Sequence, residues 1–285
     1  MKIGFIGLGI MGEAMCENIV KKSEAEVLVY DINTGQINKL VNLGAINGGN
    51  IENITKNCDV IISMLPTGKH VRTVYKEIIE MLTPGKILID MSTIEPDVSR
   101  ELALEVNKKG SVMLDAPVVK SKPAAISGQL GIYVGGDVKI YEQVKHILGY
   151  MGSNIIYMGE NGNGLVMKIC HNMLVAEIQN GVNETIKVAE KCGLDFDDVV
   201  TAISYGGGQN FYLDGKKNVI KNQDFTTAFS IENMNKDINI AVKLGESVNV
   251  KLPGAEAARE VYSKAMESGF AKEDFSATIK VVRSN

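Results

Sequence analysis

The sequence has few residues of the kinds that form disulfides or bind metals. Its four cysteines and three histidines are Cys16, Cys58, Cys170, Cys192, His70, His146 and His171. No two cysteines form a CxxC pair, and no histidine has metal-ligand spacing with them. We therefore expect a reduced protein that binds no metal.

The sequence also lacks an excess of basic charge and a long apolar run. Its 30 Lys and Arg residues are interspersed among 34 Asp and Glu residues, and the net charge of -4 argues against a nucleic-acid partner. The apolar runs at residues 2–9 and 59–65 are far shorter than the roughly 20 residues of a membrane span. The first run has no small-residue cleavage site of the kind that ends a signal peptide. We expect a cytoplasmic protein with no membrane contact.

The first part of the chain, to about residue 160, alternates short β-rich runs with amphipathic segments. The predicted strands are Lys2–Ile6, Glu26–Tyr30, Val60–Met64, Ile87–Asp90, Val112–Asp115, Gly131–Val134 and Ile155–Tyr157. Between them, segments such as residues 11–21 and 97–109 have apolar residues at helical spacing. This alternation is typical of an α/β domain in which helices wind a parallel sheet.

The pattern changes after the glycine-rich stretch at residues 159–164. Residues 165–191 contain no proline and only one glycine, Gly181, which predicts one long helix. Further helices are predicted over residues 197–204, 231–248 and 254–268, separated by glycine-rich or polar turns. We therefore predict a dinucleotide-binding domain over residues 1–162 and an all-helical domain over residues 163–285.

A glycine-rich hexapeptide follows the first predicted strand and opens the first predicted helix. It reads Gly7-Leu8-Gly9-Ile10-Met11-Gly12, which is the GxGxxG pattern in the context that a dinucleotide site needs. Gly7 permits the tight turn, Gly9 lets the backbone approach a pyrophosphate, and Gly12 lets the helix pack on the strand. The N-terminus of the helix attracts the phosphate charge.

Asp31 gives a second, independent sign of a dinucleotide. It ends the second predicted strand, nineteen residues after Gly12, where a carboxylate can accept hydrogen bonds from the adenosine ribose. Residues 32–35 contain no Arg to bind a 2′-phosphate, and Asp31 would repel that group. The sequence therefore favours NAD over NADP as the cofactor.

Further motifs follow the glycine loop along the chain. They are Met64-Leu65-Pro66, Asp90-Met91-Ser92-Thr93, Asp115-Ala116-Pro117-Val118, Gly135-Gly136, Gly162 to Lys168 with Asn172, and Phe229 to Lys236-Asp237. With the opening Gly4 to Gly12, Met15 and Asn18, they cover almost the full chain. In this order they resemble the β-hydroxyacid dehydrogenases, a family that includes 3-hydroxyisobutyrate dehydrogenase and tartronate semialdehyde reductase.

The resemblance implies a Rossmann domain joined by a long helix to an all-helical domain, which supplies oligomer contacts and closes the active-site cleft. It implies a homodimer or homotetramer, and it places Met64, Leu65 and Pro66 against the cofactor. It also places Thr93 near the nicotinamide ribose and Lys236 at the cofactor and substrate. From the residues alone other readings stay open, because Leu65 and Pro66 could end a strand, Ser92 and Thr93 could cap a helix, and Lys236 could be solvated.

Lys168 and Asn172 are the candidate catalytic residues. They lie four apart on the long predicted helix, so their side chains point from the same face. Oxidation of an alcohol requires a group that takes the hydroxyl proton, and a lysine whose pKa is lowered by desolvation and by Lys236 can do so. The family resemblance implies that Lys168 is this acid/base. Asn172 would then orient either the substrate or Lys168 by neutral hydrogen bonds. His171 stands where the family usually has asparagine, and a lone helical histidine is more often structural.

One motif departs from the family. The usual Asp-Ala-Pro-Val-Ser-Gly-Gly holds the substrate carboxylate, whereas this chain has Val119, Lys120 and Ser121 in place of the last three residues. The pocket floor must therefore be shaped differently. Ser121 and backbone N–H groups could still donate, and Lys120 or Lys122 could meet a second anionic group, although both lysines could equally face solvent.

The sequence therefore predicts an oxidoreductase that interconverts a short 3-hydroxy acid and its semialdehyde with NAD. An imine reductase on the same scaffold is one alternative, but related imine reductases generally lack a lysine at the position of Lys168. A non-catalytic dinucleotide-binding module is another, although such a protein would be expected to have lost Lys168 or Asn172. The longer 6-phosphogluconate dehydrogenases need basic groups for a sugar phosphate, which we cannot place here.

Overall fold

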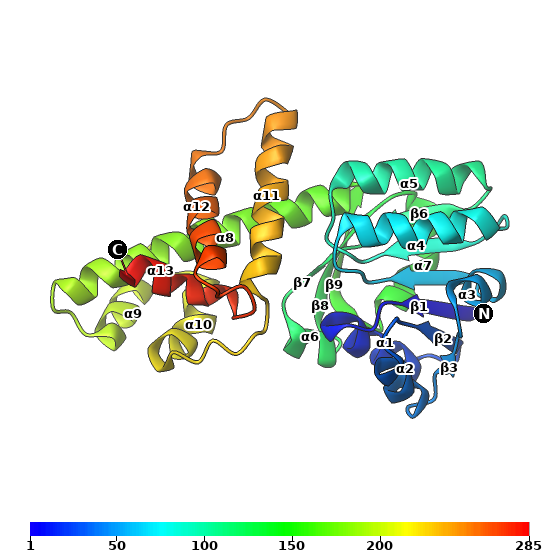
Figure 1. The fold of residues 1–285 in the computed structure, drawn as a ribbon, viewed down its shortest axis with the longest axis horizontal. Coiled ribbons are helices and arrows are strands. Elements are labelled where there is room, and N and C mark those ends of the chain that lie inside the picture. The colour runs from blue at the N-terminus through cyan, green and yellow to red at the C-terminus, as the bar shows by residue number, and fades with distance from the viewer. Residues whose placement is uncertain (285) are drawn as a thin grey trace. The chain divides into compact units, whose positions relative to one another are not determined.

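The structure of the protein is a computed structural model that describes residues 1–284 (Figure 1). Asn285, the last residue of the predicted helical domain, lies outside the described residues. The chain forms two compact units, Met1–Lys168 and Ile169–Asn285. The division falls inside the long helix that was predicted from residue 165 to 191.

The first unit is an α/β domain. Its elements are β1 (Lys2–Ile6), α1 (Ile10–Lys22), β2 (Glu26–Tyr30), α2 (Thr34–Val41), β3 (Ile46–Asn47), α3 (Ile51–Asn57), β4 (Val60–Ser63), α4 (Gly68–Met81), β5 (Ile87–Asp90), α5 (Pro96–Lys108), β6 (Val112–Asp115), β7 (Val118–Val119), α6 (Lys122–Ile126), β8 (Leu130–Gly135), α7 (Val138–Leu148), β9 (Gly152–Gly159) and the first turns of α8 (Asn163–Lys191). Each predicted strand is present, within three residues at each end.

The strand order is β3-β2-β1-β4-β5-β6-β8-β7, with β9 beside β8. The six strands from β1 to β6 are parallel, in the order of a Rossmann domain. β8 runs antiparallel to β6 and β7, and β9 is parallel to β8. The sheet is therefore mixed beyond β6, because the short segment between β7 and β8 returns the chain without a long crossover.

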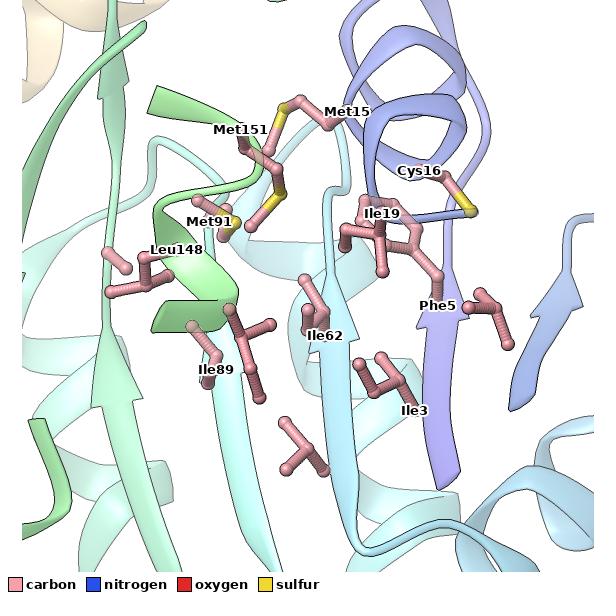
Figure 2. Close-up of a cluster of buried hydrophobic side chains, with 14 of the residues drawn as sticks. Ile3, Phe5, Met15, Cys16, Ile19, Ile62, Ile89, Met91, Leu148 and Met151 are labelled. Carbon is pink, nitrogen blue, oxygen red and sulfur yellow. The ribbon is translucent and has the colours of Figure 1, made fainter. Parts of the chain in front are cut away.

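Side chains of the central strands alternate between two cores. Ile3 and Phe5 of β1 belong to the core under α1, while Ile6 belongs to the core on the opposite face under α3, α4 and α5. Figure 2 shows Ile3 and Phe5 in the first core, with Ile19 of α1 beside them and Met151 in the same cluster. Burial of both faces explains why these strands read as continuous apolar runs.

The second unit consists of helices. They are the remainder of α8, α9 (Phe196–Ser204), α10 (Phe211–Asn222), α11 (Ile231–Ser247), α12 (Pro253–Glu267), the 3-10 helix η1 (Phe275–Thr278) and α13 (Ile279–Ser284). α11 and α12 lie side by side (Figure 1). The helices pack around a core that includes Ile186 of α8, Ile238 of α11 and Tyr262 of α12. Across the described part of the chain, no helix combines the length and apolar character of a membrane span.

Candidate functional site

The glycine loop at the end of β1 has the close backbone contacts that exclude side chains. Gly7 has a φ of +95°, and a Cβ atom there would lie 2.3 Å from the carbonyl oxygen of Met64 after β4. A Cβ atom on Gly12 would lie 2.0 Å from the carbonyl oxygen of Gly7. Gly9 is the N-cap of α1. Apart from its chain neighbours, no described residue has an atom within 4 Å of the position that a Cβ atom on Gly9 would take. The loop therefore packs tightly at Gly7 and Gly12 and leaves open space at Gly9.

Asp31 lies against this loop. Its Oδ2 atom accepts a hydrogen bond of 2.6 Å from the backbone N–H of Leu8, and its Oδ1 atom accepts one of 2.8 Å from Asn33. Since β1 and β2 are neighbouring parallel strands, their carboxyl ends bring the glycine loop and the carboxylate together. Ile10 and Met11, the other two loop residues, begin α1, with Ile10 largely exposed.

The loops after β4 and β5 are joined by a hydrogen-bonded chain. The backbone N–H of Leu65 donates to Oγ of Ser92 over 2.8 Å, and that hydroxyl donates to Oδ1 of Asp90 over 2.6 Å. Ser63 of β4 donates to the same carboxylate oxygen over 2.8 Å. Pro66 is exposed at this edge and Thr93 is partly exposed. Ser92 therefore links the two loops, and the reading of Ser92 as a cap of the next helix is wrong, because the N-cap of α5 is Glu95.

Asp90 is a buried carboxylic acid, and no basic side chain of residues 1–284 contributes to the shift of its pKa. Burial raises the pKa of Asp90 to about 6, while hydrogen bonds from Ser92 and Ser63 act in the opposite direction. Within residues 1–284 its Oδ2 atom is buried with no hydrogen-bond partner. The Asp90 carboxyl group thus connects the loops that carry Leu65 and Ser92 through its Oδ1 atom, while its buried Oδ2 atom accepts no hydrogen bond from the described residues.

A second buried carboxylate fixes the start of α8. Asp115, at the end of β6, accepts hydrogen bonds from the backbone N–H groups of Gly162 over 2.7 Å and Leu165 over 2.9 Å. A Cβ atom on Gly135 or Gly164 would lie 2.5 Å or 2.9 Å from its oxygens. Burial raises the pKa of Asp115, although these hydrogen bonds favour the ionised form. Close packing around the Asp115 side chain thus explains the motif glycines at 135 and 164, whereas Gly162 has a φ of +87° and a Cβ atom there would lie 2.7 Å from Nε of Arg100.

The candidate catalytic residues lie in the helix that Asp115 anchors. Lys168 is 7% exposed and Asn172 is 4% exposed, on the same face of α8. The Nδ2 atom of Asn172 donates a hydrogen bond of 2.6 Å to Oδ2 of Asp237 in α11. Lys236 forms an ion pair of 3.0 Å with the other oxygen of Asp237. Asn172 and Lys236, which are predicted from two different family motifs, therefore meet at one buried carboxylate.

His171 is partly buried beside these residues on α8. Among the described residues no group of three or more His, Cys, Asp or Glu side chains could hold a metal ion. The arrangement offers acid/base and hydrogen-bonding groups for the chemistry of a bound organic substrate.

Comparison with known proteins finds similarity along almost the whole chain. Residues 2–159 match the model of the NAD binding domain of 6-phosphogluconate dehydrogenase, and residues 162–282 match that of the NAD-binding domain of NADP-dependent 3-hydroxyisobutyrate dehydrogenase. Glyoxylate/succinic semialdehyde reductase 1 of Arabidopsis thaliana is 32% identical, with 99% of each chain covered. The 3-sulfolactaldehyde reductase of Escherichia coli is 33% identical over 99% of this chain and 95% of its own length.

The chain belongs to the β-hydroxyacid dehydrogenase family. The solved structure of 3-hydroxyisobutyrate dehydrogenase from Mycobacterium tuberculosis with L-serine is 30% identical, covers 99% of each chain and superposes with a TM-score of 0.93. Membership makes the chain an oxidoreductase with a nicotinamide-dinucleotide-binding domain, and it confirms the predicted Rossmann and all-helical architecture.

The loop that departs from the family sequence has an unusual backbone. Lys120 has a φ of +76°, a left-handed conformation that favours glycine. Its ammonium group donates a hydrogen bond of 2.8 Å to the carbonyl oxygen of Gln129. Val119 ends β7 and is buried, Ser121 is the N-cap of α6 without a side-chain cap, and Lys122 is exposed. The loop thus has a glycine-like conformation at a lysine where the family has glycine.

Sequence reasoning left three buried carboxylates without a role. Asp90, Asp115 and Asp237 all stood in family motifs, yet none was assigned to the site. Each hydrogen-bonds a residue or loop that was assigned, or the helix that carries one. The available signal was their apolar setting, since an aspartate at the end of a buried strand or within a buried helix face requires a partner.

Proposed function

We propose that this chain interconverts a short 3-hydroxy acid, such as 3-hydroxyisobutyrate, and its semialdehyde by hydride transfer with NAD. The observation that carries the proposal is the burial of Lys168 and Asn172 on one face of α8, at 7% and 4% exposure. Burial of an ammonium group costs free energy, so an ordinary surface lysine would not be expected there. A role in proton transfer explains a lysine at this position.

The first unit fits a dinucleotide. A Cβ atom would fill the loop at Gly7 and Gly12, while Gly9 leaves space for a pyrophosphate, and the Asp31 carboxylate lies 2.6 Å from the loop backbone. Leu65 and Thr93, on the neighbouring loops, are proposed to line the nicotinamide half. A bound nicotinamide would supply the hydride acceptor during oxidation and the hydride donor during reduction.

The proton is handled by the protein. During oxidation the C–H bond of the substrate breaks with its electron pair, the O–H bond breaks, and the proton passes to the neutral amine of Lys168. During reduction the Lys168 ammonium returns the proton to the developing alkoxide oxygen. Asn172 holds the substrate by neutral hydrogen bonds, so that its hydroxyl stays within reach of Nζ of Lys168.

The decisive experiment is a spectrophotometric assay of NADH formation across short hydroxy acids, including 3-hydroxyisobutyrate, glycerate, 4-hydroxybutyrate and a hydroxy diacid. We expect Lys168→Ala to lower kcat by about a hundredfold to ten-thousandfold, the usual contribution of a general base. Lys191→Ala is the matched control, because Lys191 is an exposed lysine at the far end of the same helix. Binding of NADH without turnover of any acid, or turnover of cyclic imines instead, would refute the proposal.

The preference for NAD is a separate part of the proposal. A 2′-phosphate on the ribose would approach the Asp31 carboxylate, and the nearby Lys39 forms an ion pair of 3.2 Å with Glu13. We therefore expect the ratio of kcat/KM for NAD to that for NADP to exceed one and to fall at least tenfold in Asp31→Ser. A wild-type protein that prefers NADP would contradict this assignment.

The loop at residues 119–121 is proposed to bind the substrate acid group. Ser121 and the loop backbone can donate hydrogen bonds, and Lys120 or Lys122 would attract a second anionic group on the substrate. We expect Lys120→Ala with Lys122→Ala to raise KM for a hydroxy diacid more than KM for 3-hydroxyisobutyrate. An unchanged KM for every accepted acid would remove the lysines from the substrate site.

We also propose that the protein is a homodimer or homotetramer. Two aromatic side chains in the helical unit, Tyr205 at 83% and Phe211 at 89% exposure, supply apolar surface that association would bury. Light scattering coupled to size-exclusion chromatography should give a mass of two or four chains. A single-chain mass at micromolar concentration would contradict the proposal. The cytoplasmic location stays a prediction.

A further inference from the structure

Asp237 occupies a position that the proposed chemistry leaves unexplained. It lies in α11 with 1% of its surface exposed, and it contacts two predicted site residues at once. One carboxylate oxygen accepts a hydrogen bond of 2.6 Å from Nδ2 of Asn172, and the other lies 3.0 Å from Nζ of Lys236. A buried carboxylate is costly, so its retention here needs a reason beyond packing.

The contact with Asn172 fixes the orientation of an amide that could otherwise flip. An ionised carboxylate only accepts hydrogen bonds, so it selects the NH₂ end of the Asn172 side chain. The carbonyl oxygen of Asn172 is therefore turned away from Asp237. This orientation presents a hydrogen-bond acceptor, which suits a substrate hydroxyl group or the ammonium form of Lys168.

The contact with Lys236 fixes a flexible side chain. Consecutive residues in a helix point about 100° apart, so Lys236 must bend around α11 to reach the carboxylate of its neighbour. Its side chain remains 24% exposed, so it still reaches the surface of the unit. The ion pair thus limits the directions that the long Lys236 side chain can take.

We propose that Asp237 is a positioning residue, which orients the amide of Asn172 and the ammonium group of Lys236 for substrate binding and turnover. This inference rests on the proposed function, because it assumes that those two residues act on the substrate. In this inference Asp237 acts through those two side chains and not on the reacting atoms. Its effect on catalysis must therefore disappear when the residues that it orients are removed.

The test is a set of mutant cycles on the full-length protein with its best hydroxy acid. We expect Asp237→Ala to lower kcat/KM about tenfold to a hundredfold, in the range found when supporting hydrogen bonds to functional groups are removed. Asp237→Asn keeps an oxygen that can accept from Asn172 but loses the charge facing Lys236, so it should recover part of the activity. In a protein that already carries Asn172→Ala and Lys236→Ala, adding Asp237→Ala should change kcat/KM by less than about twofold.

Several outcomes separate the possibilities. An equal loss from Asp237→Ala in the wild-type and the Asn172→Ala, Lys236→Ala backgrounds would overturn the inference, because the residue would then act through the fold. If Asp237→Ala fails to fold, Asp237→Asn takes its place in the cycles. The inference would then be overturned if Asp237→Asn had the kcat/KM of the wild type and if its effect simply added to those of Asn172→Ala and Lys236→Ala. Asp198→Ala, which removes an exposed carboxylate of α9, should leave kcat/KM unchanged. Absence of turnover in the wild type would instead refute the proposed function, and this inference with it.

Discussion

Replacement of Asp90 by asparagine should make the free energy of unfolding of the protein less dependent on pH. Asp90 is buried between β4 and the loop after β5, and burial raises its pKa from 3.8 to about 6. The folded protein therefore holds the proton more tightly than the unfolded chain does. Between these two values the native state carries the extra proton, so stability decreases as pH rises.

The size of the effect follows from the two pKa values. Each tenfold change in proton affinity corresponds to about 1.4 kcal/mol, so the free energy of unfolding contributed by Asp90 should fall by about 3 kcal/mol. The contribution is complete below about pH 4 and is lost as pH rises through about 6. Asp90→Asn has no such proton, so the wild type should lose about this much stability relative to the variant between pH 4 and pH 8.

Urea unfolding at closely spaced pH values, followed by circular dichroism, measures this difference directly. Asp224→Asn is a useful control, because a hydrogen bond from Thr226 lowers the pKa of the exposed Asp224. The contribution of Asp224 should have the opposite sign, being lost as pH falls. If the free energy of unfolding of the wild type minus that of Asp90→Asn did not change with pH, the reasoning would be refuted. If this difference increased with pH, the hydrogen bonds from Ser63 and Ser92 would outweigh the effect of burial on the pKa.

Three further predictions concern the backbone. Gly12→Ala should lower the free energy of unfolding by about 2 kcal/mol or more and weaken NADH binding, because its Cβ would lie 2.0 Å from the Gly7 carbonyl oxygen; unchanged fluorescence titration with NADH would contradict this. Lys120→Gly should raise the free energy of unfolding by about 1 kcal/mol, because φ is +76°; a lower urea midpoint would show that the lysine side chain stabilises the loop more than its backbone strains it. Gly164→Ala should lower both kcat and the melting temperature. Gly164 lies at the start of α8, and a Cβ atom there would lie 2.5 Å from the carbonyl oxygen of Tyr133 in β8. A melting curve identical to that of the wild type would show that the backbone is not so closely packed there.

Most of the fold could be predicted because the central strands are buried on both faces. The interiors of strands such as Glu26–Tyr30 and Ile87–Asp90 are continuous apolar runs, Val-Leu-Val and Ile-Leu-Ile, with acidic residues only at one end of each. The two-residue strands β3 and β7 are too short to show any period and were not predicted. The antiparallel direction of β8 was also missed, because a strand of the same composition can pair in either direction.

The site could be predicted only in part, for a related reason. The glycine loop and Asp31 belong to a local pattern with a known mechanism, so the sequence was sufficient to propose them. Asp237 was not proposed, because its contact with Asn172 joins residues far apart in the chain. The left-handed backbone at Lys120 was invisible as well, since a lysine carries no sequence signal for positive φ.

The long helix α8 also limits which insertions and deletions this chain can accept. It runs without interruption over 29 residues, or about 43 Å at the usual rise per residue. One residue inserted between Lys168 and Asn172 would turn the second side chain by about 100° relative to the first and move it off their common face. An insertion in the turn before Asn163 would leave that relation intact. Length variation among relatives should therefore be found in the turns that flank α8 and be absent from the stretch between these two residues.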